Sequence, residues 1–198
     1  MELVSRLAAA VAALTARHSR VLVGIDGPDA AGKTTLADRL AAELSGPVQR
    51  VSVDDFPRPV EERYRRGELS AEGFYLDAID HDRLLAEVLV PFRNGADGAG
   101  PRTLVVDGIF LLRPQLRRLW HLSVHLRVPE QTVLARARQR DRSLYASLAE
   151  LEQRYRARYL PGQALYRAEA DPETGADVLI DNRDVSAPRI LRWDAPDC

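Results

Sequence analysis

The sequence predicts an α/β domain with a parallel sheet and a phosphate-binding loop after its first strand. Residues 27–34 read GPDAAGKT and fit the pattern G-x-x-x-x-G-K-[ST], whose backbone N–H groups surround phosphate oxygens. A short apolar segment, 20–26, precedes this loop, and a segment with helical periodicity, 35–44, follows it. Further along the chain, apolar segments alternate with helical patterns, which is typical of a parallel sheet covered by helices on both faces.

Local patterns indicate the remaining elements. The apolar stretch from Leu7 to Leu14 predicts a first amphipathic helix, because the acidic Glu2 before it does not fit a secretion signal. An arginine-rich helix is expected within 133–142. No apolar run approaches the length that spans a membrane. Besides 20–26, strands are expected at 48–53, 103–107, 122–128 and 177–180.

Length and composition predict one domain over 1–198, since 45% of the residues are hydrophobic and no Pro/Ser-rich linker interrupts the chain. A formal net charge of −1 argues against a nucleic-acid partner. The one cysteine, Cys198, leaves no partner for an intramolecular disulfide. We therefore expect a cytoplasmic protein without a membrane partner.

Lys33 is the one lysine among 28 basic side chains, and it lies inside the loop pattern. A compact, flexible ammonium group suits this position better than a planar guanidinium. We expect Lys33 to contact the β- and γ-phosphates of a nucleotide and the hydroxyl of Thr34 to ligate Mg²⁺. Asp29 is unusual in a loop that holds a polyanion, and we expect it to point outward or to cap the helix. The loop residues expected to bind the nucleotide are Gly27, Asp29, Ala30, Ala31, Gly32, Lys33, Thr34 and Thr35.

Acidic residues follow most of the expected strands, at the edge of the sheet where ligands bind in such folds. Taken singly, each could start a turn or cap a helix. With a phosphate loop beside them, they favour a metal and catalytic cluster. We expect Asp107 to hold Mg²⁺ opposite Thr34 and Asp54 to be the general base, with Asp55 as the competing candidate. The acidic positions concerned are Asp26, Asp54, Asp55, Asp107 and Asp181.

The arginine-rich segment places Arg136 and Arg140 on one face of the expected helix. A mobile lid could bring such an arginine onto a transferring phosphoryl group and exclude water. The alternative is a solvated basic helix, because charged runs often form exposed faces.

Taken together, these motifs resemble the uridine kinase and phosphoribulokinase group of P-loop small-molecule kinases. The segments that carry the resemblance are 24–35, 52–56, 77–80, 106–112, 136–141, 159–161 and 176–180. The resemblance implies a three-layer P-loop NTPase fold with a five-stranded parallel sheet and a small helical lid at about 136–150. It also implies ATP and Mg²⁺ as cofactors and a small-molecule substrate, and it leaves open a homo-oligomer.

By the same resemblance, Asp54 is the catalytic aspartate and Asp107 is the Walker-B acid. We also expect Asp54 among the metal-binding residues, with Thr34 and Asp107. Arg136 and Arg140 correspond to lid arginines, with Arg136 at the nucleotide and Arg140 at the reacting phosphate. Asp77 matches a position that binds the hydroxyls of the acceptor.

The sequence departs from uridine kinases where the acceptor is recognised. Phe74-Tyr75-Leu76 precedes Asp77, where those kinases carry Asp-His-Pro, and the loop at 91–101 is too short for the β-hairpin that holds their nucleoside. A pocket that loses such partners loses much of its specificity. The residues expected to line the acceptor site are Tyr64, Tyr75, Asp77 and Arg158.

Three functions remain open from the sequence. The first is a kinase for a nucleoside or a similar compound. The second is a kinase for another acceptor, such as pantothenate, nicotinamide riboside or a sugar phosphate. The third is a nucleotide-binding protein without efficient transfer. The sequence does not distinguish ATP from GTP.

Overall fold

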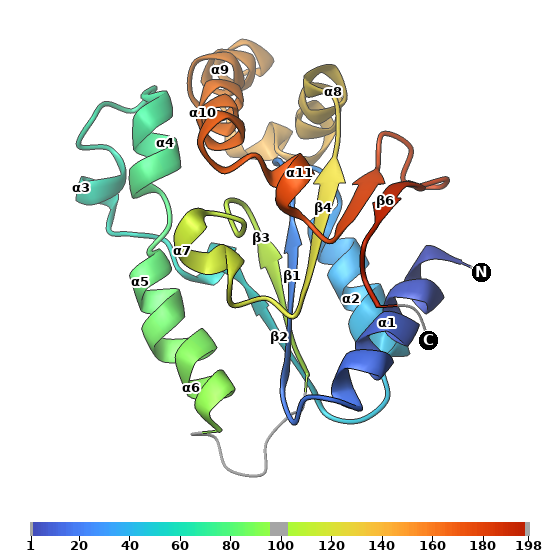
Figure 1. Cartoon of the computed structure of the whole chain (residues 1–198). Helices are drawn as coiled ribbons and strands as arrows, with labels where there is room; N and C mark the ends of the chain where they lie inside the picture. The colour runs from blue at the N-terminus through green and yellow to red at the C-terminus, as the bar shows by residue number, and fades with distance from the viewer. Residues whose placement is uncertain (1, 96–102, 197–198) are drawn as a thin grey trace.

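A computed structural model describes residues 2–95 and 103–196 and shows a twisted central sheet with helices on both sides (Figure 1). The strand order is β2-β3-β1-β4-β5-β6. The five strands from β1 to β5 pair in parallel, as predicted. β6 pairs antiparallel with β5 and was not predicted. The strands are β1 Val21–Asp26, β2 Val48–Ser52, β3 Thr103–Gly108, β4 Leu122–Arg127, β5 Val178–Asp181 and β6 Arg189–Trp193.

The helices confirm the expected first helix, the helix after the loop and the arginine-rich helix. They are α1 Leu3–Thr15, α2 Lys33–Glu43, α3 Val60–Arg63, α4 Ala71–Asp77, α5 His81–Leu84, α6 Val90–Asn94, α7 Pro114–Arg117, α8 Glu130–Arg140, α9 Leu148–Arg154, α10 Leu160–Ala170 and α11 Pro172–Gly175. Short 3₁₀ turns lie at Val53–Asp55 and Arg142–Leu144, and π-helical turns at Leu85–Leu89 and Tyr155–Tyr159.

One expected loop is shorter than predicted. The segment 91–101 was expected to be a loop throughout, but α6 continues to Asn94. Gly95 ends the helix with a φ of 72°, and 96–101 lie outside the described residues. Within the described part of the chain, no helix is both long and apolar enough to span a bilayer.

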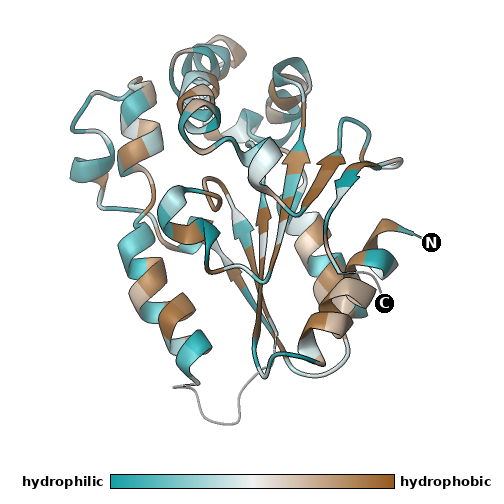
Figure 2. Cartoon of the chain, viewed as in Figure 1, coloured by the Kyte–Doolittle hydropathy of each residue, from teal (hydrophilic) through white to brown (hydrophobic). Residues whose placement is uncertain are grey.

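The core lies on both faces of the sheet because side chains of a strand alternate in direction. In β1, Val21, Val23 and Ile25 pack towards α1 and α2, whereas Leu22 packs into the opposite cluster beneath α4 to α7. All six residues of β1 are buried, as expected for a central parallel strand. Figure 2 shows this distribution as apolar strands between helices whose outer faces are hydrophilic. The buried sheet fixes the positions of the loops that follow the carboxyl ends of its parallel strands.

Close packing at the end of β3 sets the position of the 3₁₀ turn that carries Asp54. A Cβ added at Gly108 would lie 2.3 Å from Cβ of Val53. We expect Gly108→Ala to lower the free energy of unfolding by about 1–3 kcal/mol, because the added methyl group overpacks this contact. Urea unfolding measures the change. A variant as stable as the wild type would contradict the close contact.

Candidate functional site

The phosphate-binding loop leaves β1 and enters α2 through Gly32, whose φ of 89° favours glycine. Nζ of Lys33 donates a hydrogen bond to the Pro28 carbonyl at 2.7 Å, across the loop. Nδ2 of Asn182, after β5, donates to the Ala31 carbonyl at 2.6 Å. The loop is therefore held from within and from the neighbouring strand.

Arg136 on α8 joins the loop to the segment after β5. Its guanidinium donates to the Ala30 carbonyl at 3.1 Å and to the Asn182 carbonyl at 2.8 Å. Burial lowers the pKa of Arg136, with Asp184 acting in the opposite direction. Arg136 therefore lies beside the loop.

Thr34 and Asp107 lie together at the ends of α2 and β3. Oγ1 of Thr34 donates to Oδ2 of Asp107 at 2.7 Å, and Arg50 of β2 holds Oδ1 at 2.8 Å. Arg50 also pairs with Asp38 at 3.0 Å. A hydroxyl and a carboxylate are oxygen ligands of the kind that Mg²⁺ prefers, so this pair fits the metal. Sequence reasoning missed Arg50, because only the pairing of β2 with β3 brings it to Asp107.

Two cavities meet at the carboxyl edge of the sheet. The first, which we call the phosphate cavity, has a volume of about 610 Å³ and is lined by loop residues 29–35 together with Asp107 and Arg136. The second, the aromatic cavity, has a volume of about 290 Å³. Its rings are those of Tyr64, Phe74, Tyr145, Tyr155 and Tyr159. Residues that line both cavities are Asp29, Asp54, Ile109, Arg140, Asp141 and Leu144.

A third cavity lies on the other side of the phosphate loop. It has a volume of about 640 Å³ and is enclosed by Gly32, Thr35, Arg39, the segment 182–188 and the start of α1. Asn182 belongs both to its wall and to the hydrogen bonds that hold the loop. This space, which we call the base cavity, therefore adjoins the phosphate cavity through the loop.

The expectation that Asp29 points outward is wrong. Asp29 lines both the phosphate and the aromatic cavity, and its Oδ2 is buried. Burial raises the pKa of Asp29, Lys33 and Arg140 act against that rise, and Asp54 adds to it. The expected helix cap is also absent, since Gly32 is the N-cap of α2 and no side chain caps it. The loop thus carries a half-buried acid at the junction of the cavities.

Arg140, at the end of α8, is held by its neighbour. Nε donates to Oδ1 of Asp141 at 2.5 Å, and the hydroxyl of Tyr155 donates to Oδ2 of the same carboxylate at 2.7 Å. The hydrogen bond to Asp141 raises the pKa of Arg140, and burial acts against it. Arg140 therefore lies charged at the junction of the two cavities.

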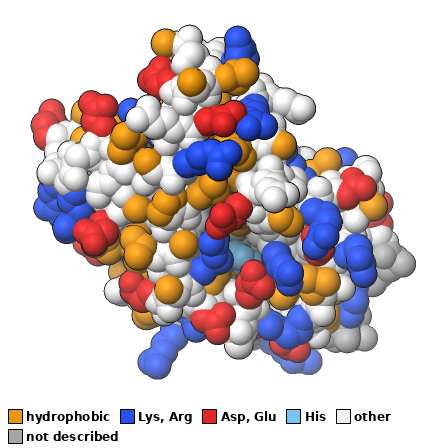
Figure 3. All heavy atoms as spheres, turned by 90° about the horizontal axis from the view of Figure 1, so that it is seen from above, with side chains coloured by type: hydrophobic (Ala, Val, Ile, Leu, Met, Phe, Trp, Pro, Cys, Tyr) orange, Lys and Arg blue, Asp and Glu red, His pale blue; other side chains and the backbone are white. Residues whose placement is uncertain are grey.

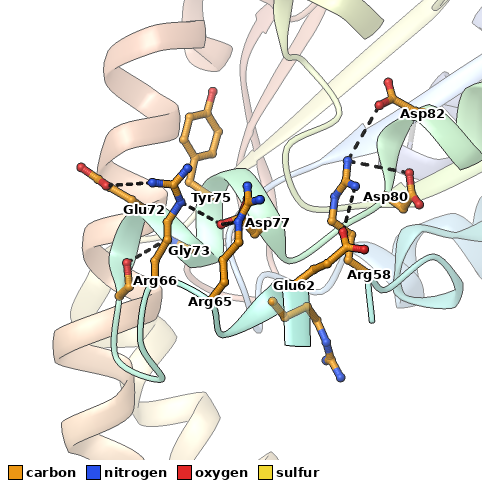
Figure 4. Close-up of polar contacts among 12 residues, drawn as sticks. Arg58, Glu62, Arg65, Arg66, Glu72, Gly73, Tyr75, Asp77, Asp80 and Asp82 are labelled. Atoms are coloured by element: carbon orange, nitrogen blue, oxygen red, sulfur yellow. Dashed lines mark hydrogen bonds and ion pairs between the residues drawn. The ribbon is translucent and has the colours of Figure 1, made fainter. Parts of the chain in front are cut away.

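The residues expected to bind the acceptor separate into two groups. Tyr64 and Arg158 line the aromatic cavity, whereas Tyr75 and Asp77 do not. Arg65 and Arg66 bind the carboxylate of Asp77 at 2.7 and 2.8 Å (Figure 4). Desolvation would raise the pKa of Asp77, but its hydrogen bonds to Arg65 and Arg66 lower it. The two arginines thus occupy the carboxylate of Asp77, which is not among the residues that line the aromatic cavity.

Arg158 contributes to the wall of the cavity through main-chain contacts. Its guanidinium donates to the carbonyls of Arg63, Gly67, Glu68 and Ser70 at 3.1–3.4 Å. The side chain is buried, and burial lowers its pKa. Arg158 therefore fixes the segment 63–70 over the aromatic cavity.

The expected acidic cluster does not form as a whole. The carboxylate of Asp26 is buried, accepts hydrogen bonds from Leu111 N and the Tyr166 hydroxyl, and lies 2.7 Å from Nδ1 of His125. Asp181 pairs with Arg183. In residues 2–95 and 103–196, no group of three or more His, Cys, Asp or Glu side chains is arranged to hold a metal. Asp54 and Asp107 line the phosphate cavity, and Asp55 lines neither cavity.

Figure 3 looks onto the end of the molecule where the strands finish. Acidic and basic side chains are interspersed there with apolar ones, and no single charge dominates the face. This mixed charge agrees with the formal net charge of −1.

No protein family profile matches this sequence. Among solved structures, a possible uridine kinase from Bacillus stearothermophilus is similar, with a TM-score of 0.67, 21% identity, and coverage of 90% of this chain and 99% of the other. A provisionally assigned fructose transport system kinase from Silicibacter sp. TM1040 has a TM-score of 0.71, 22% identity and coverage of 86% and 96%. D-Glycerate 3-kinase from Cryptococcus neoformans var. grubii has a TM-score of 0.65, 15% identity and coverage of 96% and 100%.

The sheet order, the phosphate loop and these similarities define an α/β fold of the P-loop class. More particularly, the chain shares its fold with the three kinases just described. The resemblance seen in the sequence is thus confirmed at the level of the fold. The three kinases are named for different acceptors.

Proposed function

We propose that this protein transfers the γ-phosphoryl group of Mg²⁺-bound ATP to a hydroxyl group of a small metabolite. The observation that carries the proposal is the shared wall of two cavities, one lined by the phosphate loop and one by aromatic rings. Asp54 and Arg140 lie on that wall, where a phosphoryl donor and an acceptor would meet. The proposal assigns 1–198 to one kinase domain, with a lid at about 136–150.

The donor side follows from the loop. Backbone N–H groups of the loop and the ammonium group of Lys33 bind phosphate oxygens, and the base cavity takes the nucleoside part of ATP. Thr34, Asp107 and Asp54 would hold Mg²⁺, which would neutralise charge on the phosphates of the nucleotide. Arg136 orders the loop that contacts the nucleotide.

On the acceptor side, Asp54 takes the proton of the attacking hydroxyl group. The acceptor oxygen then forms a bond to the γ-phosphorus as the bond from that phosphorus to the β–γ bridging oxygen breaks, which leaves ADP. Arg140 stabilises the charge on the transferring group. The lid keeps bulk water away from the reaction.

A nucleoside is the first acceptor to test, because aromatic rings can stack on a planar base. A second class is an acceptor with a carboxylate or phosphate group. Arg63 favours this class, since it is a cation that lines the aromatic cavity.

A coupled ADP-release assay with Mg²⁺-ATP tests the proposal. The acceptor panel contains uridine, cytidine, nicotinamide riboside, pantothenate, D-fructose and D-glycerate. We expect at least one compound to stimulate ADP release well above the rate with ATP alone. Nucleotide binding without stimulation by any of them would favour a non-catalytic nucleotide-binding protein.

Arg140→Ala is expected to lower turnover by about 10- to 100-fold while changing ATP affinity little, because the guanidinium acts on charge that develops during transfer. Steady-state kinetics and titration with a fluorescent ATP analogue separate the two effects. Arg138→Ala is the matched control, since Arg138 pairs with Glu152 at 2.6 Å and lines neither cavity. Equal rates in both variants would contradict a role of Arg140 in transfer and would favour the alternative that α8 is a solvated basic helix.

A further inference from the structure

Arg50 lies on β2, at one edge of the sheet, and its side chain reaches the candidate metal site. Each nitrogen of its guanidinium has an acceptor. Nε donates to Oδ1 of Asp38 at 3.1 Å. Nη1 donates to the carbonyl of Val105 at 2.9 Å, and Nη2 donates to Oδ1 of Asp107 at 2.8 Å. Three acceptors in fixed positions suit a planar, forked guanidinium, whereas a lysine offers a single nitrogen.

The register of the strands explains how Arg50 reaches Asp107. In the parallel pair of β2 and β3, Arg50 is opposite Val105 and Ser52 is opposite Asp107. Side chains two residues apart in a strand point to the same face, so Asp107 is a diagonal neighbour of Arg50. A long side chain spans this diagonal. The contact is therefore set by the pairing of the strands.

The contacts of Arg50 close a ring of four side chains through α2. Thr34 and Asp38 are four residues apart, so they lie on one face of that helix. The Thr34 hydroxyl donates to Oδ2 of Asp107, whereas Arg50 holds Oδ1. The ring ties the first turn of α2 to the end of β3, and it gives each oxygen of Asp107 a fixed partner.

The burial of Asp107 makes this partner important. The side chain of Asp107 is 2% exposed, and that of Arg50 is 23% exposed. A carboxylate that is taken out of water is costly unless a cation and hydrogen-bond donors meet it. Among the ion pairs of the described residues, Arg50 is the one basic partner of Asp107. Arg50 therefore supplies the charge that opposes this buried acid.

We propose that Arg50 is a positioning residue for Mg²⁺ binding, because it holds Asp107 with Oδ2 directed at Thr34. Residues that orient metal ligands without touching the metal strongly affect metal affinity. The inference rests on the proposed function, which assigns Thr34 and Asp107 to Mg²⁺. It adds a residue of the edge strand to a site that the phosphate-loop pattern does not contain.

The test measures binding of metal and nucleotide, so it needs no acceptor. Electron paramagnetic resonance follows the binding of Mn²⁺ in the presence of ADP, and a fluorescent ADP analogue is titrated with and without Mg²⁺. We expect Arg50→Met to lower Mn²⁺ affinity by about 10- to 100-fold. The affinity for metal-free ADP should change by less than about threefold, since the phosphate loop is unaltered. Arg50→Lys should recover only part of the loss.

Two control variants separate the contact with Asp107 from general effects of charge. Asp38→Asn removes the outer partner of Arg50, which is 65% exposed, and should leave Mn²⁺ affinity within about threefold of the wild type. Arg138→Met removes an arginine from the pair with Glu152 and should bind Mn²⁺ like the wild type. A loss in either control as large as that in Arg50→Met would overturn the inference.

A double-mutant cycle tests whether Arg50 acts through Asp107. In the Asp107→Asn background, adding Arg50→Met should cause no further loss of Mn²⁺ affinity, because its target is gone. The double variant also leaves no unpaired buried charge, so we expect it to fold. If Arg50→Met alone does not fold, Arg50→Lys completes the same cycle. Losses that simply add would overturn the inference.

The outcomes distinguish this inference from the proposed function. Unchanged or higher Mn²⁺ affinity in the Arg50 variants would overturn the positioning role and leave the kinase function standing. A wild-type protein whose nucleotide affinity gains nothing from Mg²⁺ would overturn the metal assignment of Thr34 and Asp107, and the inference with it. A loss in Arg50→Met that disappears in the Asp107→Asn background would support the inference.

Discussion

Lys33→Ala is expected to lower phosphoryl transfer by at least about 10²–10³-fold, because the ammonium group that neutralises the phosphates during transfer is lost. In the structure Nζ of Lys33 lies 2.7 Å from the Pro28 carbonyl, so the side chain already reaches across the loop. A coupled ADP-release assay with the best acceptor measures the loss. Near-normal activity of Lys33→Ala would contradict the assignment of residues 27–34 as the loop that binds the phosphates.

Lys33→Arg tests why a chain that otherwise uses arginine keeps one lysine. The planar guanidinium does not fit a position that needs a compact point charge. We expect Lys33→Arg to restore less than a tenth of the wild-type rate, although its charge is unchanged. Circular dichroism should show both variants folded. Full activity of Lys33→Arg would mean that charge alone suffices.

Asp54→Asn is expected to lower kcat by about 10²–10⁴-fold, because an amide cannot take the proton of the attacking hydroxyl. Asp54 is exposed at the junction of the phosphate and aromatic cavities, on the 3₁₀ turn after β2. The affinity for ATP without Mg²⁺ should change little, since the phosphate loop is unaltered. A steady-state assay and a nucleotide titration give the two values.

Asp55→Asn is the matched control for this variant. Asp55 is also exposed and lies on the same 3₁₀ turn, but it lines neither cavity. We expect its rate to stay within about threefold of the wild type, as for most surface substitutions away from a site. A large loss in Asp55→Asn with normal activity in Asp54→Asn would exchange the roles of the two residues.

Local patterns in the sequence predicted most of the sheet and the phosphate loop. The five parallel strands are apolar segments between polar turns, and the loop has glycines at fixed spacing. β6 lacks such a signal, because its residues are largely exposed and Ile190 and Leu191 are adjacent rather than alternating. Its position depends on pairing with β5, which no local pattern records.

The candidate site was harder to predict where its residues depend on distant contacts. Asp77 looked available for an acceptor, but the chain brings Arg65 and Arg66 back to its carboxylate. Asp29 was expected to point outward, and its place in the lining of the aromatic cavity depends on tertiary packing that the loop pattern does not record. Tyr145 and Tyr159 were missed because tyrosines in a helical region are more often packing residues.

The attachment made by Arg158 has a consequence for how acceptor preference can change during evolution. This guanidinium holds the segment 63–70 through carbonyl oxygens, which every residue type provides. Side chains on that segment, Tyr64 among them, can therefore be replaced without removing its anchor. Mutations there can alter what the cavity accepts while the sheet and the phosphate loop are preserved.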